Sequence, residues 1–212
     1  MKLDTQINRR IKKYGPKGGL DHTAQTVMAL SGVNHQSVKE HNERVALLAE
    51  ATAIELGKDA KAAFFAGLLH DTGKVTQPHN LFDGHNITAE EYAQVKEHAK
   101  DGYQVLAGRH LFTALCAGMH HAMYFHGYGI TVSRMPKKWH MGTVKKALEI
   151  AGVISICDFV DAFSQRKTTI KDGSDQGGQD LRSMLYSKYP EDHQVIEIVL
   201  KKNIQFGFVK AA

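Results

Sequence analysis

Apolar residues recur at helical spacing along most of this chain. Between His41 and Leu56 they fall three or four positions apart, which gives a helix one apolar face, and Gly57 offers a stop for it. The same reasoning predicts further helices at residues 60–70, 111–121, 144–163, 179–188 and 191–203. No alternating pattern of convincing length indicates a strand. The pattern therefore predicts an all-α fold.

Polar segments rich in turn-forming residues separate these helices. Loops are expected at residues 72–88, 122–141 and 165–178. Thr88 and Glu91 have the spacing of a capping box, which predicts a helix that begins after Thr88 and continues to about residue 106.

The first 34 residues contain the basic run NRRIKKYGPKGG, which favours a solvated or frayed segment. We therefore expect an N-terminal extension over residues 1–34 and a single domain over residues 35–212, a length that suits one hydrophobic core.

Composition places the chain among ordinary globular proteins, with 42% hydrophobic and 23% charged residues. Cys116 and Cys157 lie in apolar runs, so we expect buried thiols and not a zinc–thiolate cluster. The N-terminal residues lack the apolar region of a signal peptide, and no apolar stretch is long enough to span a bilayer. A cytoplasmic location with no membrane partner is therefore expected.

Charge and histidine content narrow the kind of ligand. The net charge of +5 is a mild excess that suits an anionic small-molecule substrate, and it is not concentrated in a stripe, so a nucleic-acid partner is not expected. Histidine is unusually frequent, with 13 copies, and the count matters only where several converge.

Three apolar helices carry chemistry-bearing residues in unusual places. Asp158 lies in the middle of VISICDFVDAF, where an ionised carboxylate is costly unless it is paired or binds a metal. The pair His70-Asp71 closes AAFFAGLLHD, and His120-His121 closes LFTALCAGMHH. A lone histidine near a helix is more often structural, but several nitrogen and oxygen ligands on rigid helices suit a transition metal.

Five segments, taken in order, resemble the HD superfamily of metal-dependent phosphohydrolases, and most closely its HD-GYP branch. They are HNERVALLAE, GLLHDTGK, VKEHAKDGYQVL, MHHAMYFHGYG and VISICDFVDAFSQRK, and together they cover about residues 38–170. The resemblance implies a helical bundle around a binuclear metal site that hydrolyses a phosphoester.

The resemblance also implies a ligand set for two divalent ions, iron or manganese above all: His41, His70, Asp71, His98, His120, His121 and Asp158. Asp71 would bridge the two ions and hold them at catalytic separation. Lys74, one turn past the HD pair, would act with Asp71 in catalysis and hold a substrate phosphate, and Arg166 would be a second phosphate contact.

The sequence departs from the branch at two places. The Gly-Tyr-Pro tripeptide is reduced to Gly127-Tyr128-Gly129, so this loop need not recognise a cyclic dinucleotide. Ser37 stands where members with three metals carry a glutamate, with Glu40 instead next to His41, so two metals are expected.

Three further residues have open roles. Asp161, one turn after Asp158, either orients a ligand histidine or is a surface carboxylate. His85 and His126 lie in predicted loops and are expected to be exposed.

Several functions remain compatible with this pattern. Hydrolysis of a phosphodiester such as a cyclic dinucleotide is favoured, and a nucleotide monophosphate or triphosphate is the nearest alternative. A diiron oxygenase with the same ligand cage and a metal-binding regulatory module without turnover are the others. The oligomeric state is left open.

Overall fold

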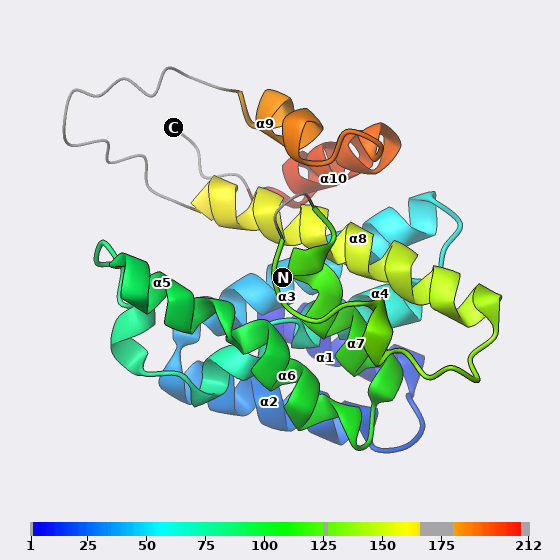
Figure 1. The fold of residues 1–212 in the computed structure, drawn as a ribbon, viewed down its shortest axis with the longest axis horizontal. Helices are drawn as coiled ribbons and strands as arrows, with labels where there is room; N and C mark the ends of the chain where they lie inside the picture. Colours follow the sequence, from blue (N-terminus) through cyan, green and yellow to red (C-terminus); the bar gives the residue numbers. More distant parts are fainter. Residues whose placement is uncertain (1, 125–126, 166–179, 209–212) are drawn as a thin grey trace.

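The computed structural model describes residues 2–124, 127–165 and 180–208, and these residues form ten α-helices and four short 3₁₀ segments, with no strand among them (Figure 1). The α-helices are α1 (Leu3–Tyr14), α2 (Leu20–Asn34), α3 (Gln36–Glu55), α4 (Ala60–Leu69), α5 (Ala89–Lys96), α6 (His98–Ala107), α7 (Leu111–Met119), α8 (Met141–Gln165), α9 (Leu181–Lys188) and α10 (His193–Phe206). The 3₁₀ segments are η1 (Thr72–Thr76), η2 (His79–Phe82), η3 (His120–Ala122) and η4 (Val132–Arg134). The all-α prediction is confirmed, and no helix in the described ranges has the length and apolar character needed to cross a membrane.

Helix α4 lies at the centre of the bundle. Its sequence AAFFAGLL is apolar on every side, and a helix of this kind is stable only when neighbours cover its whole surface. Phe64, Phe65, Leu68 and Leu69 are fully or almost fully buried against α1, α2 and α3. The helix begins at Asp59, whose side chain accepts a hydrogen bond from the Ala62 amide. Residues at its end therefore start from a rigid, buried position.

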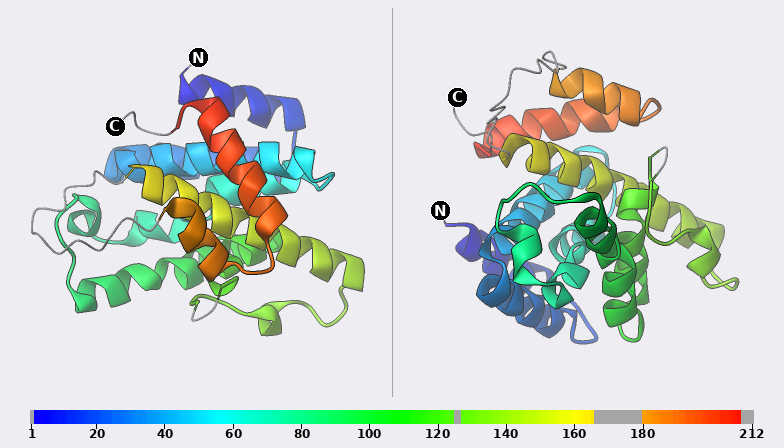
Figure 2. Two further views of the ribbon diagram at one scale, coloured as in Figure 1. Left: turned by 90° about the horizontal axis from the view of Figure 1, so that it is seen from above. Right: turned by 60° about the vertical axis from the view of Figure 1, so that its left-hand side comes forward.

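Helix α8 is the longest element and carries the second part of the core. Its residues Ile150 and Ile154 pack with Leu48 of α3 and Met119 of α7. Figure 2 shows α9 and α10 on one side of α8, with α4, α6 and α7 on the other. Because α8 is covered from both sides, most side chains in its middle are buried.

The N-terminal residues differ from the expected frayed segment. They form α1 and α2, which pack on α3 and α4, with Ile7 and Ile11 buried. Tyr14 donates a hydrogen bond of 2.6 Å to buried Glu50, and Arg10 forms an ion pair with the same carboxylate. Burying each isoleucine contributes about 1.5–3 kcal/mol, which outweighs the tendency of a short basic helix to fray. The division into an extension and a domain at residue 35 stays a prediction.

The other elements follow the sequence pattern with local differences. The capping box is present: Thr88 accepts from the Glu91 amide, and the Glu91 carboxylate accepts from the Thr88 amide. The helix that follows is divided at Glu97 into α5 and α6, and the expected loop over 72–88 contains η1 and η2. Cys116 and Cys157 are free and buried, as expected.

Candidate metal centre

The ends and middles of five helices bring the predicted ligands together. His41 lies on α3, His70 and Asp71 follow α4, His98 begins α6, His120 and His121 follow α7, and Asp158 lies on α8. Their potential ligand atoms form three overlapping groups, each within 4.8 Å: His98, His120 and His121; His41, His70 and Asp71; and His70, His120 and Asp158. All seven residues that sequence reasoning selected as ligands therefore surround one point.

Three of the histidines are oriented in the same way. His70, His98 and His120 each direct Nδ1 at the backbone carbonyl three residues earlier, over 2.8 Å to Gly67 and 2.6 Å to Val95 in the first two. A carbonyl oxygen only accepts, so Nδ1 carries a proton, and in the neutral form of such a ring Nε2 carries the lone pair.

These three Nε2 atoms are buried and have no hydrogen-bond partner. Burial also lowers the pKa of His120 well below its usual range, which keeps the ring neutral. Buried lone pairs without a partner are costly, and imidazoles held by a second bond at Nδ1 are the usual ligands of transition metals.

The Asp71 carboxylate lies between two groups of histidines. Its Oδ1 is 3.1 Å from Nε2 of His98, and its Oδ2 is 3.4 Å from Nε2 of His70 and 3.7 Å from Nε2 of His41. Burial alone would raise the pKa of Asp71, but His70 and Lys74 hold it well below its usual range. With His98 in its neutral form, its Nε2 lone pair would face an ionised oxygen of Asp71 at 3.1 Å, an arrangement that a cation between them would stabilise.

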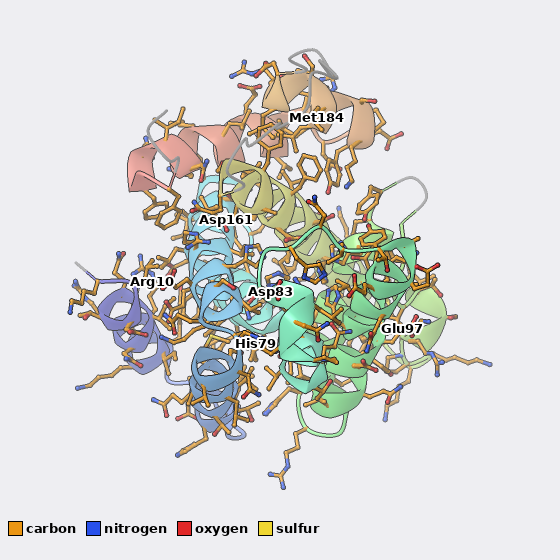
Figure 3. All side chains as sticks on the ribbon, turned by 90° about the vertical axis from the view of Figure 1, so that its left-hand side faces the viewer. Arg10, His79, Asp83, Glu97, Asp161 and Met184 are labelled. Carbon is orange, nitrogen blue, oxygen red and sulfur yellow. The ribbon has the colours of Figure 1, made fainter. Side chains whose placement is uncertain are left out.

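His41 is held from outside the site. Asp161 is fully buried and lies 2.8 Å from its Nδ1, while Nε of Arg44 donates to the other Asp161 oxygen over 2.6 Å. Asp161 extends from α8 toward α3 (Figure 3). The alternative of a surface carboxylate therefore does not hold. Burial lowers the pKa of His41, but the contacts to Asp158 and Asp161 outweigh it and raise the pKa to about 9.

Asp158, on α8, is the last member of the cluster of candidate ligands. Its Oδ1 is 3.0 Å from Nε2 of His41, and its Oδ2 is 3.8 Å from Nδ1 of His121. Burial raises the pKa of Asp158, but contacts to His41 and His70 lower it well below the usual range. A second anionic oxygen therefore faces the same point as Asp71.

Lys74 lies at the edge of the ligand cluster on η1. Its ammonium donates to Oδ2 of Asp71 over 2.6 Å, and its side chain is 17% exposed, so it contacts the buried carboxylate and also lines a cavity. His85 is exposed, as expected, and pairs with Asp83 and Glu91. Arg166 and His126 lie outside the described residues.

A close backbone contact fixes η1 against α6. A Cβ atom at Gly73 would lie 2.0 Å from the His98 carbonyl oxygen and 2.8 Å from the Gly102 amide nitrogen. Only glycine allows this approach, and it holds the segment after His70 and Asp71 beside His98.

The segment Gly127-Tyr128-Gly129 covers His121. The Tyr128 ring stacks on the His121 ring, with centroids 4.3 Å apart, and the Tyr128 amide donates to the His121 carbonyl. Gly127 permits that contact, since a Cβ there would lie 2.0 Å from the same carbonyl oxygen. Gly129 has φ of 106°, a conformation that favours glycine. This segment therefore positions a ligand candidate.

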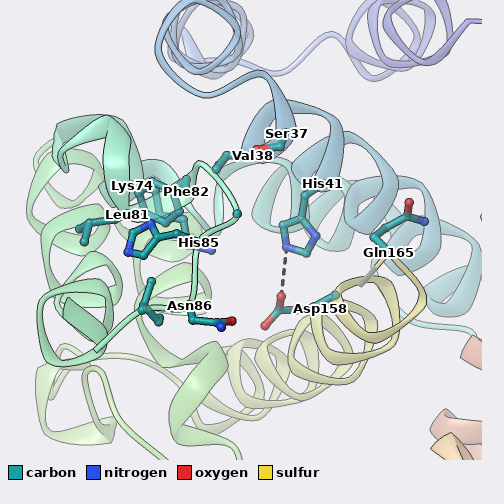
Figure 4. Close-up of a pocket in the computed structure, with 13 residues that line it drawn as sticks. Ser37, Val38, His41, Lys74, Leu81, Phe82, His85, Asn86, Asp158 and Gln165 are labelled. Carbon is teal, nitrogen blue, oxygen red and sulfur yellow. Dashed lines mark ion pairs between the residues drawn. The ribbon is translucent and has the colours of Figure 1, made fainter. Parts of the chain in front are cut away.

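Two adjoining cavities open onto the ligand cluster. The larger, of about 1020 Å³, is lined by polar residues that include Ser37, His85 and Asn86 (Figure 4). The smaller has a volume of about 450 Å³. Lys74 and Asp158 line both cavities, so a ligand that fills them would pass directly over the candidate metal centre.

Residues 38–162, more than half of the chain, match the HD domain family. The chain therefore belongs to the HD domain family of phosphohydrolases, whose members are typically enzymes. The geometry agrees with this family, because the buried histidine and aspartate groups provide a donor set for divalent metals.

Sequence relatives are ribonucleases. The chain is 33% identical over 105 residues to Ribonuclease Y of Enterococcus faecalis, a match that covers 44% of this chain and 20% of that protein. It is 47% identical over 64 residues to Ribonuclease Y of Bacillus subtilis, covering 30% of this chain and 12% of that protein. The chain thus spans about a fifth or less of the length of these relatives.

Solved structures support the fold. The HD domain of the L. monocytogenes phosphodiesterase PgpH has a TM-score of 0.50 and 19% identity, with 85% of each chain covered. The same domain in complex with cyclic-di-AMP has a TM-score of 0.50 and 20% identity over the same share. The HD-GYP branch in particular stays a prediction.

Proposed function

We propose that this chain hydrolyses a phosphodiester with two divalent ions held by the seven histidine and aspartate residues. The observation that carries the proposal is the position of the ionised Asp71 carboxylate between the buried, unpartnered Nε2 atoms of His70 and His98. The third such atom, on His120, belongs to the groups that contain these two histidines. A centre of this type favours metal-assisted hydrolysis because phosphodiesters resist attack until charge on the phosphoryl group is withdrawn.

The two oxygens of Asp71 support a division of the ligands. On the side of Oδ2 lie His41 and His70, whose Nε2 atoms are 3.0 and 3.8 Å from Oδ1 of Asp158. On the side of Oδ1 lies His98, whose ligand atom is within 4.8 Å of those of His120 and His121. We assign the first set to one ion and the second set to the other, with Asp71 as the bridge. Nitrogen and oxygen ligands of this mixture suit iron or manganese. Such ions, when bound, would polarise the phosphoryl oxygens and make a water acidic enough to attack at neutral pH.

Lys74 would hold the substrate. Its ammonium now donates to Asp71 and lines both cavities, so a phosphate above the centre lies within its reach. A point charge there would neutralise a phosphoryl oxygen and favour binding of the anion. Arg166 stays the proposed second contact.

A phosphodiester is favoured over a phosphomonoester. The relatives are a ribonuclease and a phosphodiesterase, and PgpH binds cyclic-di-AMP. The paired cavities agree with this preference, because a diester has a substituent on each side of its phosphorus. A small diester such as a cyclic dinucleotide is the proposed substrate.

Metal analysis of Asp71→Asn, combined with hydrolysis of bis(p-nitrophenyl) phosphate, tests the proposal. We expect about two ions per chain after manganese loading of the unmodified protein, and loss of both metal and activity in the variant. Asp21→Asn, a partly exposed residue in the first turn of α2, is the matched control and retains both. Lys74→Ala is expected to keep the metal and to raise KM. Full metal content and hydrolysis in Asp71→Asn, with a normal unfolding transition, would refute the proposal.

A further inference from the structure

The smaller cavity beside the metal centre has an aromatic wall. Six aromatic residues line it: Phe82, Tyr92, Tyr124, Tyr128, Phe159 and Tyr189. Three proposed metal ligands, His98, His121 and Asp158, line the same space. A ligand in this cavity therefore contacts aromatic faces while one end of it reaches the centre.

Lys188 brings a positive charge into that aromatic wall. Its Nζ lies 3.7 Å from the centroid of the Tyr124 ring and 4.4 Å from that of Phe159, which are cation–π distances. The lysine is the last residue of α9, far in sequence from every other residue of the centre.

The position of Lys188 is fixed by its neighbours. Leu185, one turn earlier, is fully buried in the core, and the Tyr189 hydroxyl lies 2.9 Å from Oγ of buried Ser155 on α8. An ammonium held in advance of binding costs less conformational entropy than one on a mobile segment.

The chemistry of the cavity suits a nucleotide. Aromatic faces bind a flat π-system by stacking, and every nucleobase has such a face. Lys74 and Lys188 on its walls favour an anion with hydrogen-bond acceptors. An aliphatic phosphoester would leave the aromatic wall without a partner. The volume of about 450 Å³ lies within the usual range for small-molecule sites, roughly 300–1,000 Å³.

We propose that the smaller cavity is a nucleobase subsite, with Tyr124 and Lys188 as its specificity-determining residues. The substrate class is then a nucleotidyl phosphodiester, which rests on the proposed function. One nucleotide occupies the smaller cavity, with its base against the aromatic wall and an acceptor facing Lys188. Its phosphate lies over the metal centre, and the remainder of the diester extends into the larger cavity.

Equilibrium binding separates recognition of the base from recognition of the phosphate. The probes are AMP and ribose 5-phosphate, which share a sugar phosphate and differ in the base, titrated calorimetrically into the manganese-loaded full chain. We expect AMP to bind about 5- to 140-fold more tightly, the range that stacking on one base supplies.

Two variants test the assigned residues. Lys188→Met keeps most of the apolar stem and removes the charge, and Tyr124→Leu removes the ring. Each is expected to lower AMP affinity at least about fivefold and to leave ribose 5-phosphate binding unchanged. Lys201→Met, on the outer side of α10 and paired with Glu55, is the matched control and keeps both affinities. Thermal unfolding of each variant confirms that α9 stays in place.

Equal binding of the two probes by the unmodified chain would overturn the subsite, and so would unchanged AMP affinity in both variants. Because the test measures equilibrium binding, its result does not depend on whether the chain hydrolyses a substrate. A preference for AMP that both variants remove supports the subsite even where bis(p-nitrophenyl) phosphate is not hydrolysed, a result that counts against the proposed function alone.

Discussion

Replacing Gly73 with alanine is expected to disturb the metal centre without touching a ligand. The new Cβ would lie 2.0 Å from the His98 carbonyl oxygen and 2.8 Å from the Gly102 amide nitrogen. Both neighbours are backbone atoms, so no side chain can rotate away. A normal contact needs a shift of more than about 1 Å between η1 and α6, and overpacking of this kind costs about 1–3 kcal/mol. Because His98 moves with α6, its distance from Asp71 also changes.

Urea unfolding and metal analysis measure the two effects together. We expect Gly73→Ala to lower the free energy of unfolding by about 1–3 kcal/mol and to lose metal from the side of Asp71 that faces His98. Gly152→Ala in α8 is the matched control: nothing lies within 4 Å of its Cβ position, so the helix should be stabilised by about 0.5–1 kcal/mol. A Gly73→Ala protein with unchanged stability and full metal content would show that the close approach of η1 and α6 has no bearing on the centre.

Two further predictions concern charges behind the site. Asp161→Asn leaves Arg44 without its buried partner and removes the anion that holds His41. We therefore expect the free energy of unfolding to fall by about 3 kcal/mol and calorimetry to show weaker metal binding. Unchanged metal affinity would contradict the positioning role of Asp161. Burial raises the pKa of Glu43 from 4.5 to about 7, despite the nearby Lys39, so the folded state favours the protonated form and stability falls as pH rises between those values. Glu43→Gln should therefore gain stability relative to the unmodified chain, by at most about 3 kcal/mol, between pH 4.5 and 8; a pH-independent difference in unfolding free energy would refute this.

Five of the seven proposed metal ligands were accessible to sequence reasoning because they lie in unusual local patterns, whereas His41 and His98 were implied only by the family resemblance. A polar pair that ends an apolar helix, as His70-Asp71 does, is costly to bury unless hydrogen-bonding groups, opposite charges or a metal ion contact it there. Helix positions were accessible for a similar reason, since apolar periodicity records which face is covered. The order of these segments along the chain then implied the ligand set that the fold brings together.

The features that sequence reasoning did not predict depend on contacts between segments that are distant in the sequence. Arg44 is one of many basic residues on helices, and only the fold places it on Asp161, 117 positions away. Lys188 lies on a short helix with no motif around it, so nothing local indicates a place beside the centre. No sequence pattern marked Gly73 as important, because position 73 requires glycine on account of its close contact with α6 and not on account of its backbone angles. The packing of α1 was missed because two isoleucines are a weak pattern among basic residues.

The bonds from His70, His98 and His120 to carbonyls three residues earlier have a consequence for folding. Each imidazole is tied to the last turn of a different helix, α4, α5 or α7. A ligand atom is in place only while that turn is wound, and a bound ion in return opposes the unwinding of all three. Metal occupancy and helix-end fraying are thus linked, so protection of the backbone amides at these three ends from hydrogen exchange should rise with occupancy.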